Sequence, residues 1–536
     1  MPSRRLIPFL LLCLFIAQPP RLAASESTND PLAAAVATLG LGSASDVREA
    51  VAALASSNDP RAFALLSELA EGQLQVDQAA GVYRSATDGW RHVLSGAPPP
   101  ADTELVAPSL TNTLRRQLGA VRAQMQITSP DASQRLTGAR AMAEKPTPEA
   151  DAVLRAGLEK ESDASVRHWL GIAVAQLDLQ SADPAVRLKA VTVLAQAGRL
   201  SDRALIAPLA SDAEIDGSVR AAAVQALNRI DRHQWWASQA ANLFYGLSLG
   251  SILLLSALGL AITFGLMGVI NMAHGEMLML GAYTTYVVQR LFQSLWPAWQ
   301  DGYLFAAIPA AFVVTALVGV ALERLVIRHL YGRPLETLLA TWGISLALIQ
   351  AVRLIFGAQN VSVANPSWLA GGWTVAEGLV LTYNRLAIIV FALAVLSMAF
   401  LLLQRTSLGL TVRAVTQNRP MAAAMGINTA SIDAWTFGLG SGIAGLGGVA
   451  LSQLDNVAPD LGQGYIVDSF MVVVLGGVGQ LAGTFFGAFG LGLLNKFLEP
   501  EIGAVLGKVL VLVLIILFIQ RRPQGLFAQR GRAVEA

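Results

Sequence analysis

Cysteine is almost absent from this sequence, and charged residues are scarce. The single cysteine, Cys13, has no partner among the 536 residues, which excludes an internal disulfide and a cysteine-based metal site. Only 14% of the residues are charged whereas 54% are hydrophobic, a balance typical of a membrane protein with a soluble part. The formal net charge of +1 gives no electrostatic reason to expect binding to nucleic acid.

Motifs for nucleotide hydrolysis and metal catalysis are also missing. The segment Gly503–Val509 is one residue too short for a phosphate-binding loop and lacks the Ser or Thr that holds magnesium. His274-Gly-Glu276 is not followed by the second histidine of a zinc-binding helix. Gly438–Gly442 has the wrong spacing for a nucleophile elbow. We therefore expect no enzymatic activity, no metal and no cofactor, so that any ATP must be hydrolysed by another chain.

The first 25 residues are predicted to form a signal peptide. Arg4 and Arg5 provide a short positive head, residues 6–17 form a brief apolar core, and mostly small residues follow at 22–25. The core is too short to span a bilayer comfortably, although an uncleaved anchor is the alternative. In both cases residue 26 onward begins outside the cytoplasm.

Residues 26–238 are predicted to form an exported domain of helical repeats. The motif Asp-x-x-Val-Arg occurs three times, each time ahead of an amphipathic pattern, at Asp163–Arg167, Asp183–Arg187 and Asp216–Arg220. Its aspartate suits a helix N-cap, and its valine begins a buried stripe. The motifs resemble HEAT-type repeats, but their irregular spacing leaves a plain helical bundle as the alternative. Paired Trp235 and Trp236 are typical of the membrane interface, so we place the end of the domain just after them.

Residues 239–522 are predicted to form a polytopic transmembrane helix bundle, so that the whole chain is all-α. Runs of about twenty apolar residues lie at 242–264, 270–289, 303–327, 335–356, 385–404, 433–453 and 504–520. The run 466–498 is too long for one span, and we divide it at the glycine-rich turn 476–483. With about nine crossings, the arginine-rich segments and the tail 523–536 fall on the cytoplasmic side, as the positive-inside rule requires.

A polar cluster interrupts the second of these runs. Asn271, His274 and Glu276 lie within six positions, and an ionisable side chain at membrane depth costs roughly 2.5–3.5 kcal/mol on insertion scales. On an unbroken helix Glu276 would point away from the other two. We therefore expect Gly275 to interrupt the helix and the three side chains to converge on a solute path. A membrane-boundary turn, in which they satisfy loose helix ends, is the alternative.

Other polar residues lie within the runs. Thr341 and Ser345 offer hydroxyl groups around a glycine, and they either line the same path or join neighbouring helices. Lys496 and Glu499 are three residues apart and are expected to pair near a span end.

The sequence around the polar cluster resembles a known transporter family. Asn271–Glu276 and Gly281–Tyr283 resemble the signature of the branched-chain amino acid type of ABC importer permease. The flanking segments Ala261–Ile270 and Tyr283–Tyr286 are most similar to the urea branch of that family, and the resemblance covers about 242–527. It implies a membrane subunit through which a small solute crosses while separate subunits hydrolyse ATP.

The long segment Arg405–Asp433, which is expected on the cytoplasmic side between two runs, carries a second feature of this family. Within it, a proline suited to a first helical turn and Gly426 as a helix stop predict one short helix between two spans. The Ala-Ala-x-Gly pattern of Ala423, Ala424 and Gly426 resembles the coupling loop that docks into the ATPase, and we include Arg413 in this candidate site. The acidic residue that usually precedes the alanines is missing, and a generic surface turn is the alternative.

These observations predict a permease subunit of an ATP-driven importer for a small polar solute, and the resemblance indicates urea. The expected partners are ATP-binding subunits, a second related permease subunit, a periplasmic solute-binding protein and membrane lipid, with no nucleic acid. We expect the protein in the bacterial inner membrane, with a periplasmic N-terminal domain and a cytoplasmic C-terminus.

Two alternative functions are considered. The first is an importer permease for branched-chain or other amino acids, although basic residues that would face a solute carboxylate are scarce inside the runs. The second is a membrane-anchored helical scaffold or sensor, which the many apolar runs disfavour.

Overall fold

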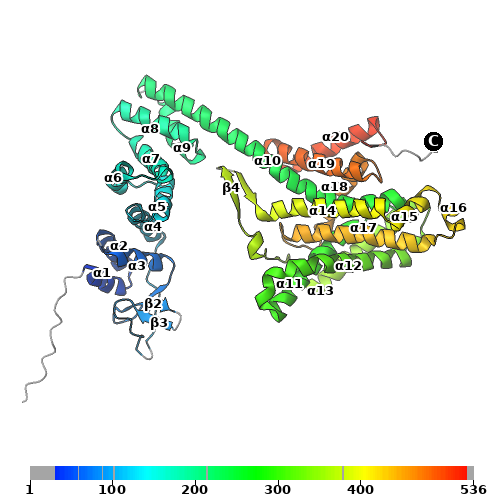
Figure 1. Cartoon of the computed structure of the whole chain (residues 1–536), viewed down its shortest axis with the longest axis horizontal. Coiled ribbons are helices and arrows are strands. Elements are labelled where there is room, and N and C mark those ends of the chain that lie inside the picture. Colours follow the sequence, from blue (N-terminus) through cyan, green and yellow to red (C-terminus); the bar gives the residue numbers. More distant parts are fainter. Residues whose placement is uncertain are drawn as a thin grey trace, which may run out of the picture. The chain divides into compact units, whose positions relative to one another are not determined.

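The computed structural model describes residues 31–57, 59–86, 89–100, 103–212, 215–376 and 379–527 (Figure 1). The predicted signal peptide 1–25 lies outside the described residues, and so does the tail beyond residue 527. The chain divides into two compact units, Met1–Ile230 and Asp231–Ala536, and each has hydrophobic cores of its own. Helices make up most of both units.

The first unit is built mainly from short helices: α1 (Pro31–Gly40), α2 (Ala44–Ser56), α3 (Pro60–Ala70), α4 (Asn112–Ile127), α5 (Ala132–Glu144), α6 (Asp151–Lys160), α7 (Ala164–Asp178), α8 (Pro184–Ala197) and α9 (Leu200–Ser211). Asp163 and Asp183 cap α7 and α8 as predicted, and Asp131 caps α5 in the same way. Neighbouring helices pack on one another, as α7 does on α5 and α8. The HEAT-type repeat stays a prediction.

The fold is mainly helical as predicted, but the first unit also contains a small sheet that the sequence did not predict. The strands β1 (Leu74–Val76), β2 (Val82–Ala86) and β3 (Gly89–His92) form an antiparallel sheet in that order. The Asp77 side chain accepts hydrogen bonds from the N–H groups of Ala79 and Gly81, which stabilises the turn between β1 and β2. The strands are too short to show a period-two pattern that the sequence alone would reveal.

The helix α10 (Gly217–Met267) carries the chain from the first unit into the second. The predicted domain boundary near residue 238, just after Trp235 and Trp236, therefore falls inside a helix of 51 residues and not in a loop. No proline or glycine occurs between Ser218 and Tyr245, so nothing in the local sequence ends the helix.

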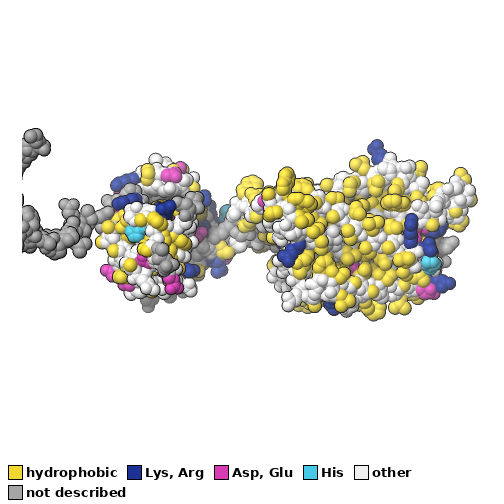
Figure 2. All heavy atoms as spheres, turned by 90° about the horizontal axis from the view of Figure 1, so that it is seen from below, with side chains coloured by type: hydrophobic (Ala, Val, Ile, Leu, Met, Phe, Trp, Pro, Cys, Tyr) yellow, Lys and Arg dark blue, Asp and Glu magenta, His cyan; other side chains and the backbone are white. Residues whose placement is uncertain are grey.

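The second unit continues as a bundle of helices: α11 (His274–Leu295), α12 (Tyr303–Leu325), α13 (Pro334–Phe356), α14 (Tyr383–Arg405), α15 (Ser407–Gln417), α16 (Arg419–Ala424), α17 (Thr429–Ser452), α18 (Leu461–Gly476), α19 (Leu481–Ile502) and α20 (Ala504–Arg521). Among the described residues, seven helices are long and apolar enough to cross a membrane. The helix α11 is not one of them because polar residues occur along its 22 positions, and α18 has only 16 residues. Hydrophobic side chains cover most of the visible face of this unit (Figure 2), as a surface in contact with lipid requires.

The long apolar run 466–498 is divided between two helices, as predicted. α18 ends at Gly476 and α19 begins at Leu481, and the turn between them contains Gly477 and Gly479 with φ of +99° and +80°. Only glycine adopts such angles without steric cost.

A hairpin is the second departure from the all-α prediction. The strands β4 (Gly372–Ala376) and β5 (Leu379–Thr382) pair between α13 and α14. Val361, which precedes the hairpin, forms an isolated antiparallel bridge with Val457. The loops that follow α13 and α17 are therefore joined.

The helix α17 is the centre of the second unit, because α11 and α12 both pack along it. Its glycines permit this approach. A Cβ atom at Gly445 would collide with Thr315 of α12, and one at Gly448 would collide with the Leu278 carbonyl of α11. Such close packing is typical of small residues between membrane helices, and it places the first turns of α11 in the interior of the bundle.

Candidate functional site

The polar cluster lies where the chain passes from α10 to α11. Because α10 ends at Met267 and α11 begins at His274, residues 268–273 interrupt the helical path. Gly268 has φ of +69°, a left-handed conformation that favours glycine. The helix is therefore interrupted as predicted, but ahead of the position that the sequence indicated, since Gly275 lies inside α11.

Gly275 contributes to packing. A Cβ atom at Gly275 would collide with the Gly462 carbonyl of α18, and a Cβ atom at Gly462 would collide with the Gly275 carbonyl. Two backbones can approach this closely only where both residues lack a side chain. The predicted role of Gly275 as the helix-breaking residue is thus corrected: it holds the start of α11 against α18.

Asn271 stabilises the interruption itself. Its side chain is fully buried, and its Oδ1 accepts a hydrogen bond of 3.0 Å from the N–H of Ala273, which is an Asx turn. The neighbouring N–H of Met272 donates to Thr341 Oγ1 of α13 at 3.1 Å. The interruption is therefore fixed both by its own side chain and by a hydroxyl group from another helix.

Glu276 is joined to the same helix. Its Oε1 accepts a hydrogen bond of 2.8 Å from the Ser345 hydroxyl group of α13, and both side chains are buried. Thr341 and Ser345 are four residues apart and so lie on one face of α13. The structure thus joins the start of α11 to α13 through two hydrogen bonds, one from Met272, which follows Asn271, to Thr341 and one from Ser345 to Glu276.

His274 points to a different helix. It is fully buried, its Nε2 donates to the Ser256 carbonyl of α10 at 2.9 Å, and its ring lies against Gly259. Side chains two residues apart on a helix diverge by about 200°. His274 and Glu276 both belong to α11, so they do not converge as we predicted.

Several polar atoms of the cluster lack a hydrogen-bond partner among the described residues: Asn271 Nδ2, His274 Nδ1 and Glu276 Oε2. A buried polar group without a partner costs about 1–3 kcal/mol, so each of these atoms calls for an explanation. Asn271 presents a free donor and Glu276 presents a free acceptor. A small solute that carries both an acceptor and a donor would satisfy this pair.

Sequence reasoning overlooked Tyr283. Its side chain is 2% exposed, its hydroxyl group has no partner among the described residues, and its ring lies 4.7 Å from that of Phe356 in α13. Tyr283 follows Glu276 by seven residues, which is two helical turns, so both lie on the same face of α11. The spacing of seven residues from Glu276 is the sequence signal that would have identified Tyr283 as a candidate site residue.

The predicted coupling segment forms α15 and the short helix α16, which Figure 1 shows at one end of the second unit. Ala423 and Ala424 are exposed, and Gly426 has φ of +88° with open space around it. Sequence reasoning overlooked Met421 and Met425, which are 59% and 77% exposed. Their spacing of four residues places two adaptable apolar side chains on one face.

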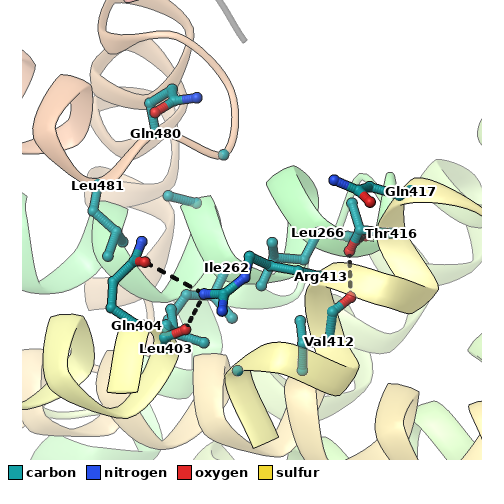
Figure 3. A pocket seen from close by; sticks show the side chains of 13 residues that line it. Ile262, Leu266, Leu403, Gln404, Val412, Arg413, Thr416, Gln417, Gln480 and Leu481 are labelled. Carbon is teal, nitrogen blue, oxygen red and sulfur yellow. Dashed lines mark hydrogen bonds between the residues drawn. The ribbon is translucent and has the colours of Figure 1, made fainter. Parts of the chain in front are cut away.

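Arg413 does not face outward with the other predicted coupling residues. Its Nη1 donates to the Leu403 carbonyl at 2.5 Å and to Gln404 Oε1 at 3.4 Å, so it ties the end of α14 to α15 (Figure 3). Arg413 also lines a cavity of about 270 Å³ together with Thr416 and Gln480. Arg413 therefore stabilises the connection between α14 and α15, whereas Ala423, Ala424 and Gly426 are exposed.

The described residues contain no group of three or more His, Cys, Asp or Glu side chains that could hold a metal ion. The polar cluster contains Asn271, Glu276, Thr341 and Ser345, and the hydrogen bonds described above for this cluster involve no lysine or arginine. The site is thus built to form hydrogen bonds, with one carboxyl group and no cation.

Comparisons with known proteins agree with this architecture. A family model described as the permease component of the branched-chain amino acid transport system matches residues 242–519. A high-affinity branched-chain amino acid transport system permease protein of Pseudomonas aeruginosa is 30% identical over 290 residues, which cover 53% of this chain and 94% of that protein.

More distant relatives include permeases with other solutes. The corresponding branched-chain amino acid permease protein of Escherichia coli K12 is 29% identical over 294 residues, which cover 54% of this chain and 94% of that protein. A ribose import permease protein of the same strain is 33% identical over 108 residues, which cover 19% of this chain and 34% of that protein. No solved structure matches the chain at a significant level.

Proposed function

This chain belongs to the branched-chain amino acid transport system permease family, and on that premise we propose that it is the permease subunit of an ATP-driven importer for a small polar solute. The second unit is the membrane permease, and the interruption between α10 and α11 lines the solute path. Separate ATP-binding subunits supply the energy through α16, with Ala423, Ala424 and Gly426 at the contact.

The observation that carries the proposal is the pair of unsatisfied groups at the interruption. Asn271 Nδ2 is a donor and Glu276 Oε2 is an acceptor; the other carboxyl oxygen of Glu276 bonds to Ser345, and Met272, next to Asn271, bonds to Thr341. A permease that only needed to pack its helices would avoid buried groups without partners. In the transport cycle they would replace part of the hydration of a solute.

Urea is the solute that this chemistry favours. Its carbonyl oxygen would accept from Asn271 Nδ2, while its N–H groups would donate to Glu276 Oε2. Urea is neutral, which suits a cluster whose hydrogen bonds, as described above, involve no lysine or arginine. The resemblance of Ala261–Ile270 to the urea branch of the family supports the same choice.

A branched-chain amino acid is the second candidate. It is favoured by the names of the relatives in Pseudomonas aeruginosa and Escherichia coli. The ammonium group of such a solute would suit Glu276, but its carboxylate would have to be bound by neutral donors such as Asn271 Nδ2 and the hydroxyl groups.

The partners of the proposed importer follow from its family. They are ATP-binding subunits, a second related permease subunit and a periplasmic solute-binding protein in the bacterial inner membrane. The first unit would lie in the periplasm and provide a docking surface for one of them. Deleting residues 27–232 behind the intact signal peptide tests this role: uptake should fall, and undiminished uptake would leave the first unit without a part in the cycle.

The main experiment measures solute-stimulated ATP hydrolysis and uptake by the complete complex in proteoliposomes, with urea, acetamide and leucine in parallel. Urea and acetamide should stimulate hydrolysis, whereas leucine should not. The variants Asn271→Ala and Glu276→Gln should reduce uptake of the preferred solute, while Ser397→Ala, at an exposed position of α14, serves as the control. Stimulation by leucine alone would replace urea with the amino acid. Uptake without any ATP-binding subunit would overturn the whole proposal.

A further inference from the structure

A cluster of charged and aromatic side chains lies at the base of α16, outside the polar site described above. Arg419 is the first residue of α16, and its Nη2 lies 2.5 Å from Asp433 Oδ2. Asp433 belongs to the start of α17, and its side chain is only 4% exposed. A buried carboxylate with a charged partner forms a strong, directional contact.

The same arginine contacts a second part of the bundle. Its guanidinium carbon lies 4.5 Å from the centre of the Tyr331 ring, which is cation–π distance. The Tyr331 hydroxyl group donates to Glu323 Oε1 at 3.4 Å, and Glu323 is buried in the last turn of α12. Arg419 is therefore shared between the start of α17 and the segment that joins α12 to α13.

These contacts lead from α16 to the polar site. Tyr331 lies three residues before α13 begins at Pro334, and α13 carries Thr341 and Ser345. Those two hydroxyl groups hold Met272 and Glu276 at the interruption of the helical path. Rigid helices and charged hydrogen bonds that join two sites can transmit a displacement between them.

An ion pair on the surface at the same end of the second unit does not connect separate elements of the bundle in this way. Arg333 pairs with Glu336 at 3.1 Å, but both side chains are more than half exposed and both belong to the start of α13 or the residue before it. An exposed pair of this kind contributes little to stability, and this pair joins two residues at the start of one helix. Arg419 differs because Asp433 is buried and because the two partners of Arg419 belong to different parts of the bundle, Asp433 to α17 and Tyr331 to the turn before α13.

We propose that Arg419 is a positioning residue that couples α16 to the solute path, through Asp433 on α17 and through Tyr331 on the segment leading into α13. The inference rests on the proposed function, in which α16 receives the ATP-driven displacement. Arg419 itself contacts neither the solute nor the ATP-binding subunits. It keeps α16 and the bundle moving as one body.

The test uses the complete complex in proteoliposomes and the variant Arg419→Gln. Assembly with the ATP-binding subunits and basal ATP hydrolysis should be retained, whereas solute stimulation and uptake should fall by about tenfold or more, in the range of measured coupling energies. Arg333→Gln is the matched control and should behave as the wild type. The double variant Arg419→Asp with Asp433→Arg restores an ion pair of reversed polarity and should recover part of the stimulation.

A structural readout separates coupling from stability. The chain has one cysteine, so that Cys13→Ser provides a background for spin labels at the exposed Met425 and Leu335. Addition of nucleotide should leave the distance between these labels unchanged in the wild type, because α16 and α13 move as one body. In Arg419→Gln, the distance should change, because label movement at Met425 is no longer followed at Leu335.

Each outcome decides the proposal. Wild-type stimulation and uptake in Arg419→Gln would overturn it, and so would loss of binding to the ATP-binding subunits, which would make Arg419 a docking residue. If Arg419→Gln fails to fold, a label distance that changes on addition of nucleotide to the wild type overturns it instead. Failure of the wild-type complex to couple ATP to uptake would refute the proposed function separately.

Discussion

The Ser345 hydroxyl group of α13 donates a hydrogen bond of 2.8 Å to Glu276 of α11, where the helical path is interrupted. The two residues are 69 positions apart in the chain. Because the second carboxyl oxygen of Glu276 has no partner among the described residues, the hydrogen bond from Ser345 orients this carboxyl group. The contact joins two candidate site residues that the sequence offered separately.

Ser345→Ala should therefore reduce transport more than stability. Loss of a hydrogen bond to a buried charged or polar carboxyl group costs about 1.5–3 kcal/mol, which is roughly a ten- to hundredfold decrease in uptake if the contact is needed along the path. Uptake of labelled solute by proteoliposomes measures the effect, with Ser397→Ala as the control. Unchanged uptake in Ser345→Ala would place the solute path elsewhere.

Gly462→Ala should destabilise the permease. The added Cβ atom would meet the Gly275 carbonyl, and overpacking of this kind costs about 1–3 kcal/mol. Gly464→Ala, in the same helix α18 with open space around it, should be neutral or slightly stabilising because alanine favours helix. Thermal unfolding of the two purified variants in one detergent provides the comparison. Equal midpoints would show that α11 and α18 do not need the close contact.

Gly426→Asp should abolish uptake while the permease is still inserted. Gly426 has φ of +88°, so any side chain adds backbone strain of about 1–2 kcal/mol and places a charge beside the proposed ATPase contact. Gly503→Asp also introduces a side chain at a positive φ, of +82°, with open space around it, but lies between α19 and α20. The measurement is co-purification with the ATP-binding subunits and solute-stimulated hydrolysis. Normal stimulation in Gly426→Asp would remove α16 from the coupling contact.

The first unit should lose stability as the pH falls below about 4.5. Hydrogen bonds from the Arg135 guanidinium lower the pKa of Glu161 from 4.5 to about 2, and the N–H groups of Ser162 and Asp163 act in the same direction. A carboxyl group with a lowered pKa stabilises the fold above its ordinary pKa, and this contribution is lost between pH 4.5 and about pH 2.

Hydrogen exchange of the full chain tests this prediction. Glu161→Gln should lower the opening free energy of the amides at the start of α7 by about 1–3 kcal/mol at pH 7, because two N–H groups and a guanidinium lose a charged acceptor. The difference from the wild type should shrink toward pH 2. Glu159→Gln, at an exposed position of α6, is the control. A difference that stays constant with pH would mean that folding does not lower the pKa of Glu161.

The sequence by itself determined which segments are helical and where several of them end. Apolar runs predict the membrane helices because burial in lipid requires some twenty apolar residues in a row. Asp163 and Asp183 predict helix starts because a side-chain oxygen satisfies free N–H groups locally. Glycines at the end of α18 predict the turn before α19 for the same local reason, namely backbone angles that other residues avoid.

Only the tertiary structure decided what each polar side chain contacts. His274 and Glu276 are neighbours in the chain, yet one bonds to α10 and the other to α13. Likewise, Arg419 contacts both Asp433 and Tyr331, which belong to different elements. Gly275 packs against α18 and does not end a helix. The physical reason is that hydropathy and capping act within a few residues. The partner of a buried side chain depends on how each helix is rotated and packed against helices far away in the chain.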